Sequence, residues 1–250
     1  MKRTNLLIAL IFLFAGINAQ ITKTINIEVP GQLSSLLTTE EKLNVTHLVV
    51  IGSLDKTDLD LMNLMPKLDT IDIGETFIFG NEIPDGTFNG NNHLKTIILP
   101  GSVERIGSSF QSCSALTDFK IKSPIALRSL NSMTFYNCNS LVSFTIPSSV
   151  IEINGPVFHS CENLSEILFE EPVSITTITG NPFFGCTSLK NFTIPKSVTI
   201  LTNAFYACYG LETVEFEQPV SITNLGVSAF AKSGIKSITI PASITNIEGG

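Results

Sequence analysis

Apolar and polar residues alternate with a period of two in short segments that recur along most of the chain. In Leu141-Val-Ser-Phe144-Thr-Ile146, the residues three and five positions after the leucine are apolar, and those at two and four are polar. This alternation predicts a strand with one buried face. Pro147 follows, and because proline lacks an N–H and fixes φ, it closes the strand and begins a corner.

A second pattern, Phe-x-x-Cys-x-x-Leu, precedes these strands at steps of 22 to 25 residues. A fixed period of this length predicts a solenoid, in which each coil buries its apolar groups against the coils above and below. Short units alternate with long units, and long units insert two polar residues, such as Glu170 and Glu171, before the proline corner. We expect the phenylalanines to form a ladder on the convex side. The complete copies are Phe110-Cys113-Leu116, Phe135-Cys138-Leu141, Phe158-Cys161-Leu164, Phe183-Cys186-Leu189 and Phe205-Cys208-Leu211.

Together these patterns resemble the BspA-like leucine-rich repeat of bacterial surface proteins, which the stretch 190–208 matches nearly position by position. The resemblance implies an α/β-type solenoid that is mostly β. This would be a curved leucine-rich-repeat solenoid with one parallel β-sheet and short turns or helical turns on the convex side. Repeats of alternating 22/23 and 25 residues are expected over 81–250. Residues 20–80 resemble an N-terminal capping segment with atypical repeats, including a strand at 45–51 and a helix near 55–65.

Residues 1–19 have the pattern of a signal peptide. Lys2 and Arg3 precede a short apolar run, and Ala19 supplies a small residue at the cleavage point. The apolar run is shorter than the about 20 residues of a spanning helix, and no second run of that length follows. We therefore predict a secreted or cell-surface protein with no transmembrane segment after signal cleavage.

All five cysteines occupy the same repeat position. Stacked coils would hold both their Cα and Cβ atoms about 4.8 Å apart, whereas disulfides usually need Cβ atoms within about 4.5 Å. Although exported proteins often contain disulfides, we expect a ladder of buried free thiols here. Because a ladder spreads its sulfur atoms along a line, it does not predict a zinc site.

Composition narrows the function classes. The net charge of −7 argues against nucleic-acid binding. Tryptophan is absent and only three tyrosines occur, which weakens a carbohydrate-binding interpretation. Tyr206 and Tyr209 are interpreted as surface cover over the phenylalanine ladder. The three histidines, His47, His93 and His159, lie in different coils without a partner at ligand spacing and are interpreted as ordinary surface residues. Glu170-Glu171 is interpreted as a solvated corner rather than an acid–base pair. We therefore expect no enzyme activity, no cofactor and no metal.

One candidate binding surface remains, formed by strand residues that point away from the core. Half of these residues, two and four positions after each leucine, are Ser or Thr, and Thr suits an exposed strand. The surface is flat and poor in aromatic anchors. The predicted binding residues are Asp118, Lys120, Thr145, Glu166, Leu168, Thr193 and Glu215.

Two function classes stay open at this point. The resemblance implies adhesion or protein–protein recognition, with a host or neighbouring-cell surface protein as the partner. The alternative is a structural or assembly module of a larger surface complex. The sequence ends in mid-coil with Ile247-Glu-Gly-Gly250, and solenoid ends need a polar cap. We therefore expect further coils in the natural protein, docking of this end on a partner, or end-to-end self-association.

Overall fold

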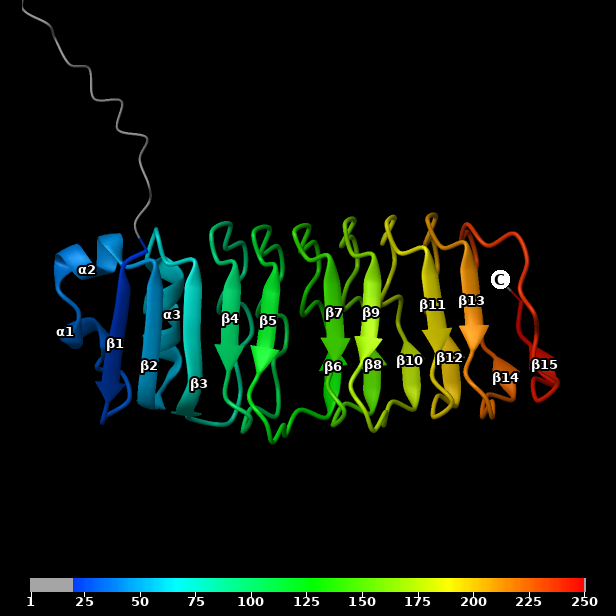
Figure 1. Ribbon diagram of the computed structural model, residues 1–250, viewed down its shortest axis with the longest axis horizontal. Helices are drawn as coiled ribbons and strands as arrows, with labels where there is room; N and C mark the ends of the chain where they lie inside the picture. The colour runs from blue at the N-terminus through cyan, green and yellow to red at the C-terminus, as the bar shows by residue number, and fades with distance from the viewer. Residues whose placement is uncertain (1–19, 250) are drawn as a thin grey trace, which may run out of the picture.

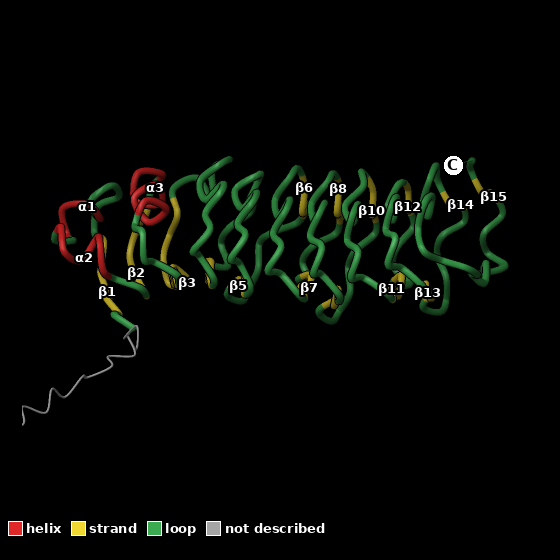
Figure 2. Tube along the Cα trace, turned by 90° about the horizontal axis from the view of Figure 1, so that it is seen from above, coloured by secondary structure: helices red, strands yellow, loops and turns green. Residues whose placement is uncertain are grey.

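The computed structural model describes residues 20–249, so the expected signal peptide at 1–19 lies outside the described residues. Figure 1 shows coils stacked side by side along one long axis, with the helices gathered at the N-terminal end. In the view from above, strands lie along two opposite sides of the stack, joined by loops (Figure 2). The predicted fold class, a mostly β parallel solenoid, is confirmed.

The N-terminal segment carries all the helices of the described residues and includes the expected helix near 55–65. Asp55 begins that helix by accepting bonds from the backbone N–H groups of Thr57 at 2.8 Å and Asp58 at 3.3 Å. Buried Asp58 in turn accepts from the N–H groups of Gly31 and Leu33, at 2.7 and 2.9 Å. These bonds fix the preceding loop against the helix. The elements are β1 (Thr22–Ile27), α1 (Leu33–Leu36), α2 (Thr39–Asn44), β2 (His47–Leu54), α3 (Lys56–Leu64) and β3 (Thr70–Ile78).

The predicted alternating segments form strands on one side of the solenoid, which we call the strand face. All of its recorded pairs are parallel. A five-stranded sheet runs in the order β1-β2-β3-β4-β5, and two separate pairs follow, β7-β9 and β11-β13. The repeat strands are β4 (Thr96–Leu99), β5 (Asp118–Ile121), β7 (Ser143–Ile146), β9 (Glu166–Phe169), β11 (Asn191–Ile194) and β13 (Thr213–Phe216).

A second parallel sheet lies on the opposite side, so the expectation of one parallel sheet with turns elsewhere is incomplete. This sheet has six short strands in the order β15-β14-β12-β10-β8-β6. Buried Ile153, Ile178 and Leu201 occupy its central positions and pair in register. The strands are β6 (Ser129–Asn131), β8 (Glu152–Asn154), β10 (Thr177–Thr179), β12 (Ile200–Thr202), β14 (Asn224–Leu225) and β15 (Asn246–Ile247).

The repeat phenylalanines form the predicted ladder through the core. Phe158 is fully buried, and its ring stacks on Phe135 at 5.5 Å and on Phe183 at 5.8 Å between centroids. From the strand face, Phe144 meets Phe158 edge-on at 5.0 Å and 62°. Stacked and edge-to-face contacts are both favourable arrangements of aromatic rings. The ladder therefore links each coil to its neighbours through direct ring contacts.

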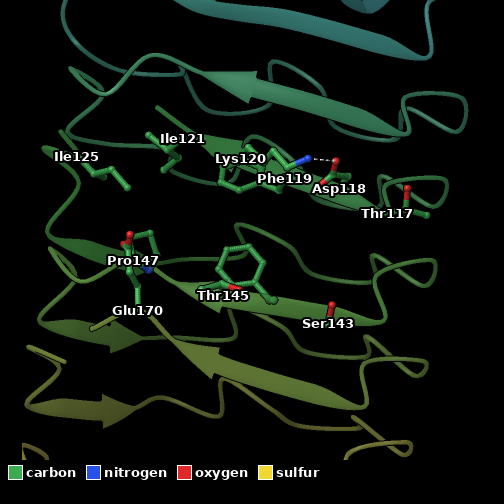
Figure 3. Close-up of a pocket in the computed structure, with 11 residues that line it drawn as sticks. Thr117, Asp118, Phe119, Lys120, Ile121, Ile125, Ser143, Thr145, Pro147 and Glu170 are labelled. Atoms are coloured by element: carbon green, nitrogen blue, oxygen red, sulfur yellow. Dashed lines mark hydrogen bonds and ion pairs between the residues drawn. The ribbon is translucent and has the colours of Figure 1, made fainter. Parts of the chain in front are cut away.

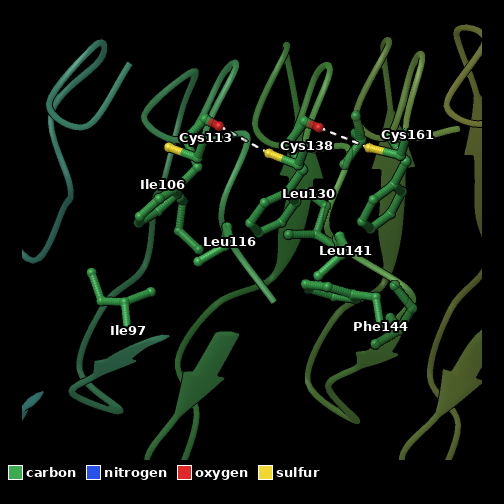
Figure 4. Close-up of a cluster of buried hydrophobic side chains, with 14 of the residues drawn as sticks. Ile97, Ile106, Cys113, Leu116, Leu130, Cys138, Leu141, Phe144 and Cys161 are labelled. Atoms are coloured by element: carbon green, nitrogen blue, oxygen red, sulfur yellow. Dashed lines mark hydrogen bonds between the residues drawn. The ribbon is translucent and has the colours of Figure 1, made fainter. Parts of the chain in front are cut away.

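The five cysteines are free and buried, which confirms the predicted thiol ladder. Each thiol also donates a hydrogen bond that the sequence did not reveal, to the carbonyl of the repeat phenylalanine in the preceding coil. Cys161 Sγ lies 3.0 Å from the carbonyl oxygen of Phe135, and the bond recurs in every copy at 2.8 to 3.1 Å. Figure 4 shows the bonds of Cys138 and Cys161. Burial raises the pKa of the Cys161 thiol to about 12, so this thiol stays protonated at neutral pH.

Candidate functional site

The structure places the predicted binding residues on the strand face. Asp118 is half-buried and the other six are exposed. Asp118 and Lys120 lie on β5, where the Lys120 ammonium meets the Asp118 carboxylate at 2.6 Å. This pair neutralises itself at the surface, and exposed pairs of this kind contribute little stability. The remaining residues are Thr145 on β7, Glu166 and Leu168 on β9, Thr193 on β11 and Glu215 on β13.

Strand pairing divides these residues into three groups. Thr145 lies opposite Leu168 in the β7-β9 pair, and Thr193 lies opposite Glu215 in the β11-β13 pair. No pairing joins β5 to β7 or β9 to β11 in the part of the chain that the structure describes. The predicted surface is therefore not one continuous sheet.

Two grooves occupy the places where the sheet opens. Figure 1 shows wider spacing between β5 and β7, and between β9 and β11, than within the pairs. The first groove, between β5 and β7, has a volume of about 290 Å³ (Figure 3). The second groove, between β9 and β11, has a volume of about 670 Å³. Binding sites for small ligands commonly have volumes of about 300–1,000 Å³, so the second groove is as large as such a site.

The groove floors are apolar and incompletely covered. Phe144 and Phe192, on the short-coil strands, are 5% and 4% exposed. The corresponding residues of the long-coil strands β5 and β9, Phe119 and Ile167, are only half-buried, whereas Val214 of the long-coil strand β13 is buried. Phe169, at the end of β9, is half-buried as well. Strands β5 and β9 therefore present part of their core side to the grooves.

The openings follow the long coils. Each long coil is fastened to the short coil before it, because the residue after its strand reaches back. The Glu170 carboxylate accepts a bond from the Ser148 N–H at 3.0 Å, and Glu217 accepts from the Lys196 N–H at 3.1 Å. No comparable bond ties these strands to the coil after them, within residues 20–249. The two-coil repeat thus sets both the pairing and the position of the grooves.

The two grooves differ in charge. The first is lined by the neutralised pair of Asp118 and Lys120 and by Glu170, which is bound to Ser148. The second is lined by Glu166 and Glu171, which form no ion pair among the described residues, and by Glu217, which pairs with Lys196 at 3.4 Å. The second groove therefore carries an excess of negative charge.

A row of half-exposed aromatic rings runs along the middle of the stack, at the position after four successive repeat phenylalanines, Phe135, Phe158, Phe183 and Phe205. Tyr136 stacks on His159 at 4.8 Å, His159 on Phe184 at 4.3 Å, and Phe184 on Tyr206 at 5.6 Å. Lys232 closes the row 5.2 Å from the Tyr206 ring. Since the rings cover each other's faces, the row does not offer the open faces on which sugars stack.

His159 corrects the expectation that all three histidines are ordinary surface residues. Its ring is half-buried between two aromatic rings, and Nδ1 lies 2.8 Å from the Ser160 hydroxyl. Burial lowers the pKa of His159 below its usual value, because the charged imidazolium loses hydration there. The sequence signal for this row is the ring-bearing residue that directly follows Phe135, Phe158, Phe183 and Phe205.

No group of three or more His, Cys, Asp or Glu side chains is placed to hold a metal ion within 20–249. No helix in this range is long and apolar enough to cross a membrane.

Comparisons with known proteins agree with this geometry. The family described as the BspA type leucine-rich repeat region matches in six copies over residues 44–127, 81–204 and 128–250. A leucine-rich repeat protein from Bacteroides ovatus shares 31% identity at a TM-score of 0.62, over 80% of this chain and 49% of its own. The leucine-rich repeat protein of T. pallidum shares 26% identity at a TM-score of 0.52, over 60% of this chain and 69% of its own.

The chain thus spans about half the length of the B. ovatus protein. No curated protein matches the sequence.

Proposed function

The chain belongs to the BspA type leucine-rich repeat family, and from this premise we propose that it is a secreted or cell-surface recognition protein without enzymatic activity. Its partner is a protein on a host or neighbouring cell, bound through the strand face. The activity of the whole protein is part of this proposal, since the chain covers 49% of its B. ovatus relative.

The exposed strand face is the observation that supports the proposal most directly. Residues of β7 and β9, and of β11 and β13, face outward in register within each pair, and six of the seven predicted binding residues are exposed. A solenoid of this kind offers an extended surface carried on a rigid scaffold. The grooves add the relief and partly exposed apolar groups that a flat strand surface lacks.

Export is supported by the signal-peptide pattern at 1–19. The free thiols are compatible with an oxidising compartment, because all five are buried and their geometry does not favour disulfides. Membership of a family named after bacterial surface proteins points to the same location.

Site-resolved photo-cross-linking tests the proposal. A photoreactive amino acid replaces Thr145, Leu168 or Glu215 on the strand face, and Glu104 or Glu152 serves as a control position outside it. We expect cross-links to proteins of intact neighbouring or host cells from the strand-face positions only. Equal cross-linking from the control positions would contradict recognition through this face.

The same experiment separates the alternative function. Cross-links formed solely between copies of this chain would favour a structural or assembly module of a larger surface complex.

A further inference from the structure

We propose that an apolar patch at the N-terminal end of the strand face, formed by Ile51, Phe77 and Phe79, holds the apolar side chains of a cationic segment of the partner protein. This inference deepens the proposed function and rests on it. It assigns the aromatic anchors that the repeat strands lack, and the chemistry of the partner that they would select.

The patch arises because β2 and β3 are longer than the repeat strands. β3 runs from Thr70 to Ile78, but β4 pairs only with its first three residues, Thr70–Asp72. Figure 1 shows β3 extending past the end of β4. Beyond Asp72, β3 therefore has a neighbouring strand on one side only, which is β2. The outward side chains of this extension are not covered by a strand of the following coil.

Strand register brings the three side chains together on the outward face. Ser53 of β2 lies opposite Phe77, and Ile51 lies two residues earlier on β2. Successive side chains of a strand point to opposite faces, so Ile51 and Ser53 share the face of Phe77. The Phe79 N–H still donates to the Leu54 carbonyl at 2.9 Å, which continues the pairing by one residue and directs Phe79 to the same face.

The three side chains are exposed, which no role in the core explains. Phe77 and Phe79 are 53% and 74% exposed, and Ile51 is 39% exposed. All other phenylalanines of residues 20–249 are buried or half-buried. Single exposed apolar residues are ordinary, but a contiguous group on one face marks an interaction site, and phenylalanine is enriched in protein interfaces. A hollow of about 370 Å³, lined by Phe79, Asp55 and Pro84 among others, gives a partner side chain room.

The surroundings of the patch are acidic. Glu28 directly follows β1 at the same end of the sheet, and Asp55 lines the hollow beside Phe79. Neither carboxylate forms an ion pair among the described residues. Lys56 also lines the hollow, but its ammonium is paired with Asp60 at 2.6 Å. A cationic partner would therefore meet two unpaired carboxylates at the rim of the patch.

This charge decides between three possible occupants. A second copy of the chain in an isologous contact would bring the same carboxylates against each other, which is unfavourable. An anionic membrane surface would be repelled by them in the same way. A protein segment that carries apolar side chains next to Lys or Arg fits both the patch and its rim, because complementary charge favours the correct partner and speeds encounter.

The test uses a fluorescent, end-blocked hexapeptide in which two leucines are flanked on each side by two lysines. Residues 20–250 are titrated against it by fluorescence anisotropy. We expect saturable binding that weakens by about tenfold or more in the double variant Phe77→Ala/Phe79→Ala. The matched control, Ile200→Ala/Tyr209→Ala, truncates side chains that are 50% and 63% exposed outside the strand face, and should leave the affinity within about twofold of the original. Since Phe77 and Phe79 are exposed, the double variant should keep the far-UV circular dichroism spectrum of the original.

A second set of measurements tests the charge. Glu28→Lys/Glu75→Lys reverses two exposed carboxylates at the patch, where Glu75 lies opposite Ile51, and should weaken binding of the hexapeptide by about fivefold or more. The control Glu104→Lys/Glu152→Lys makes the same change of net charge outside the strand face and should leave the affinity within about twofold of the original. A hexapeptide with glutamate in place of lysine should bind about tenfold more weakly or less tightly still.

Two further measurements test the excluded occupants. Sedimentation velocity should give the same mass for the original chain and for Phe77→Ala/Phe79→Ala, and vesicles of phosphatidylglycerol should bind neither. A dimer that this variant loses would assign the patch to a second copy of the chain. Vesicle binding that this variant loses would assign the patch to a membrane, and either result would overturn the inference.

The inference is also overturned if the hexapeptide shows no saturable binding, if the variants at the patch bind it as well as their controls do, or if the glutamate peptide binds equally. Its failure is distinguishable from that of the proposed function. If Thr145, Leu168 or Glu215 positions still cross-link to cell proteins while the peptide result is negative, recognition through the strand face stands and the patch is not its anchor. If both experiments are negative, both proposals fall.

Discussion

Phe158→Ala is the most direct test of the aromatic ladder as the element that holds the coils together. The side chain is fully buried and stacks between Phe135 and Phe183. Replacing a large buried side chain by alanine costs about 3–5 kcal/mol. Each ring contact adds about 0.5–1.5 kcal/mol beyond area burial. Since Phe158 also meets Phe144 edge-on, we expect a loss near the upper end, about 5 kcal/mol.

Urea unfolding followed by far-UV circular dichroism measures this loss, with Phe77→Ala as the control. Phe77 is 53% exposed, so its truncation should change the free energy of unfolding by no more than about 0.5 kcal/mol. A loss below about 1 kcal/mol for Phe158→Ala would refute the inside–outside assignment of the coil.

A double-mutant cycle then tests whether the rings of the ladder stabilise each other only where they are in direct contact. Leucine substitutions at Phe135 and Phe158 should couple by about 0.5–1.5 kcal/mol, because these rings touch. The pair Phe88 and Phe158, separated by two intervening ladder positions, should be additive within about 0.5 kcal/mol. Equal coupling in both pairs would contradict nearest-neighbour stacking.

Three further predictions follow from the repeat geometry. The five thiols should resist a thiol reagent in the native protein, and all should react in denaturant. Cys161→Ser should lower the free energy of unfolding by only about 1 kcal/mol, since the hydroxyl keeps the Phe135 carbonyl as acceptor. A loss above about 3 kcal/mol would contradict this. The folded-state pKa of His159 is lowered, so the unfolded chain binds the proton first, and urea titrations should show stability falling as pH drops below about 6.5. His159→Phe should abolish that component, and an unchanged pH profile would refute it. Ser112 has a φ of 57°, so Ser112→Gly should raise the free energy of unfolding by about 0.5–1 kcal/mol, and a decrease would count against strain there.

The repeat core was predictable because each of its positions carries one residue type at a fixed spacing. Phenylalanine and cysteine recur in constant register, and stacking of equivalent residues follows directly from a solenoid. Phe158 and Cys161 accordingly lie where the pattern placed them. The strand-face residues were predictable for a similar reason, since alternation alone determines that Thr145 and Thr193 point outward.

The grooves were not predictable from alternation, because long and short coils have the same inside–outside pattern. Ile167 and Phe192 occupy equivalent positions, yet only Phe192 is buried. This difference in burial depends on the distance between successive strands. That distance is set by the path of the two residues that each long coil inserts before its proline. The bond that the Ser148 N–H donates to Glu170 shows which neighbour the long coil joins, and side-chain spacing along the sequence contains no such information.

The second sheet was missed for a related reason. Segments such as 152–154 and 177–179 are only three residues long, too short for alternation to identify. They form strands because their backbones pair with equivalent segments of adjacent coils. The aromatic row was missed because its position varies between tyrosine, histidine and phenylalanine, so no single residue type marks it.

The thiol-to-carbonyl bonds have a consequence for how long a molecule survives. While the chain is folded, burial keeps the Cys161 thiol protonated and unreactive. Unfolding would release five thiols with ordinary pKa values near 8.5, and an oxidising medium would join them into disulfides. The folded coils do not favour such bridges, so an oxidised chain could not readily regain its structure. Each excursion to the unfolded state would then be a one-way event, and the working lifetime would be set by the unfolding rate rather than by the equilibrium free energy.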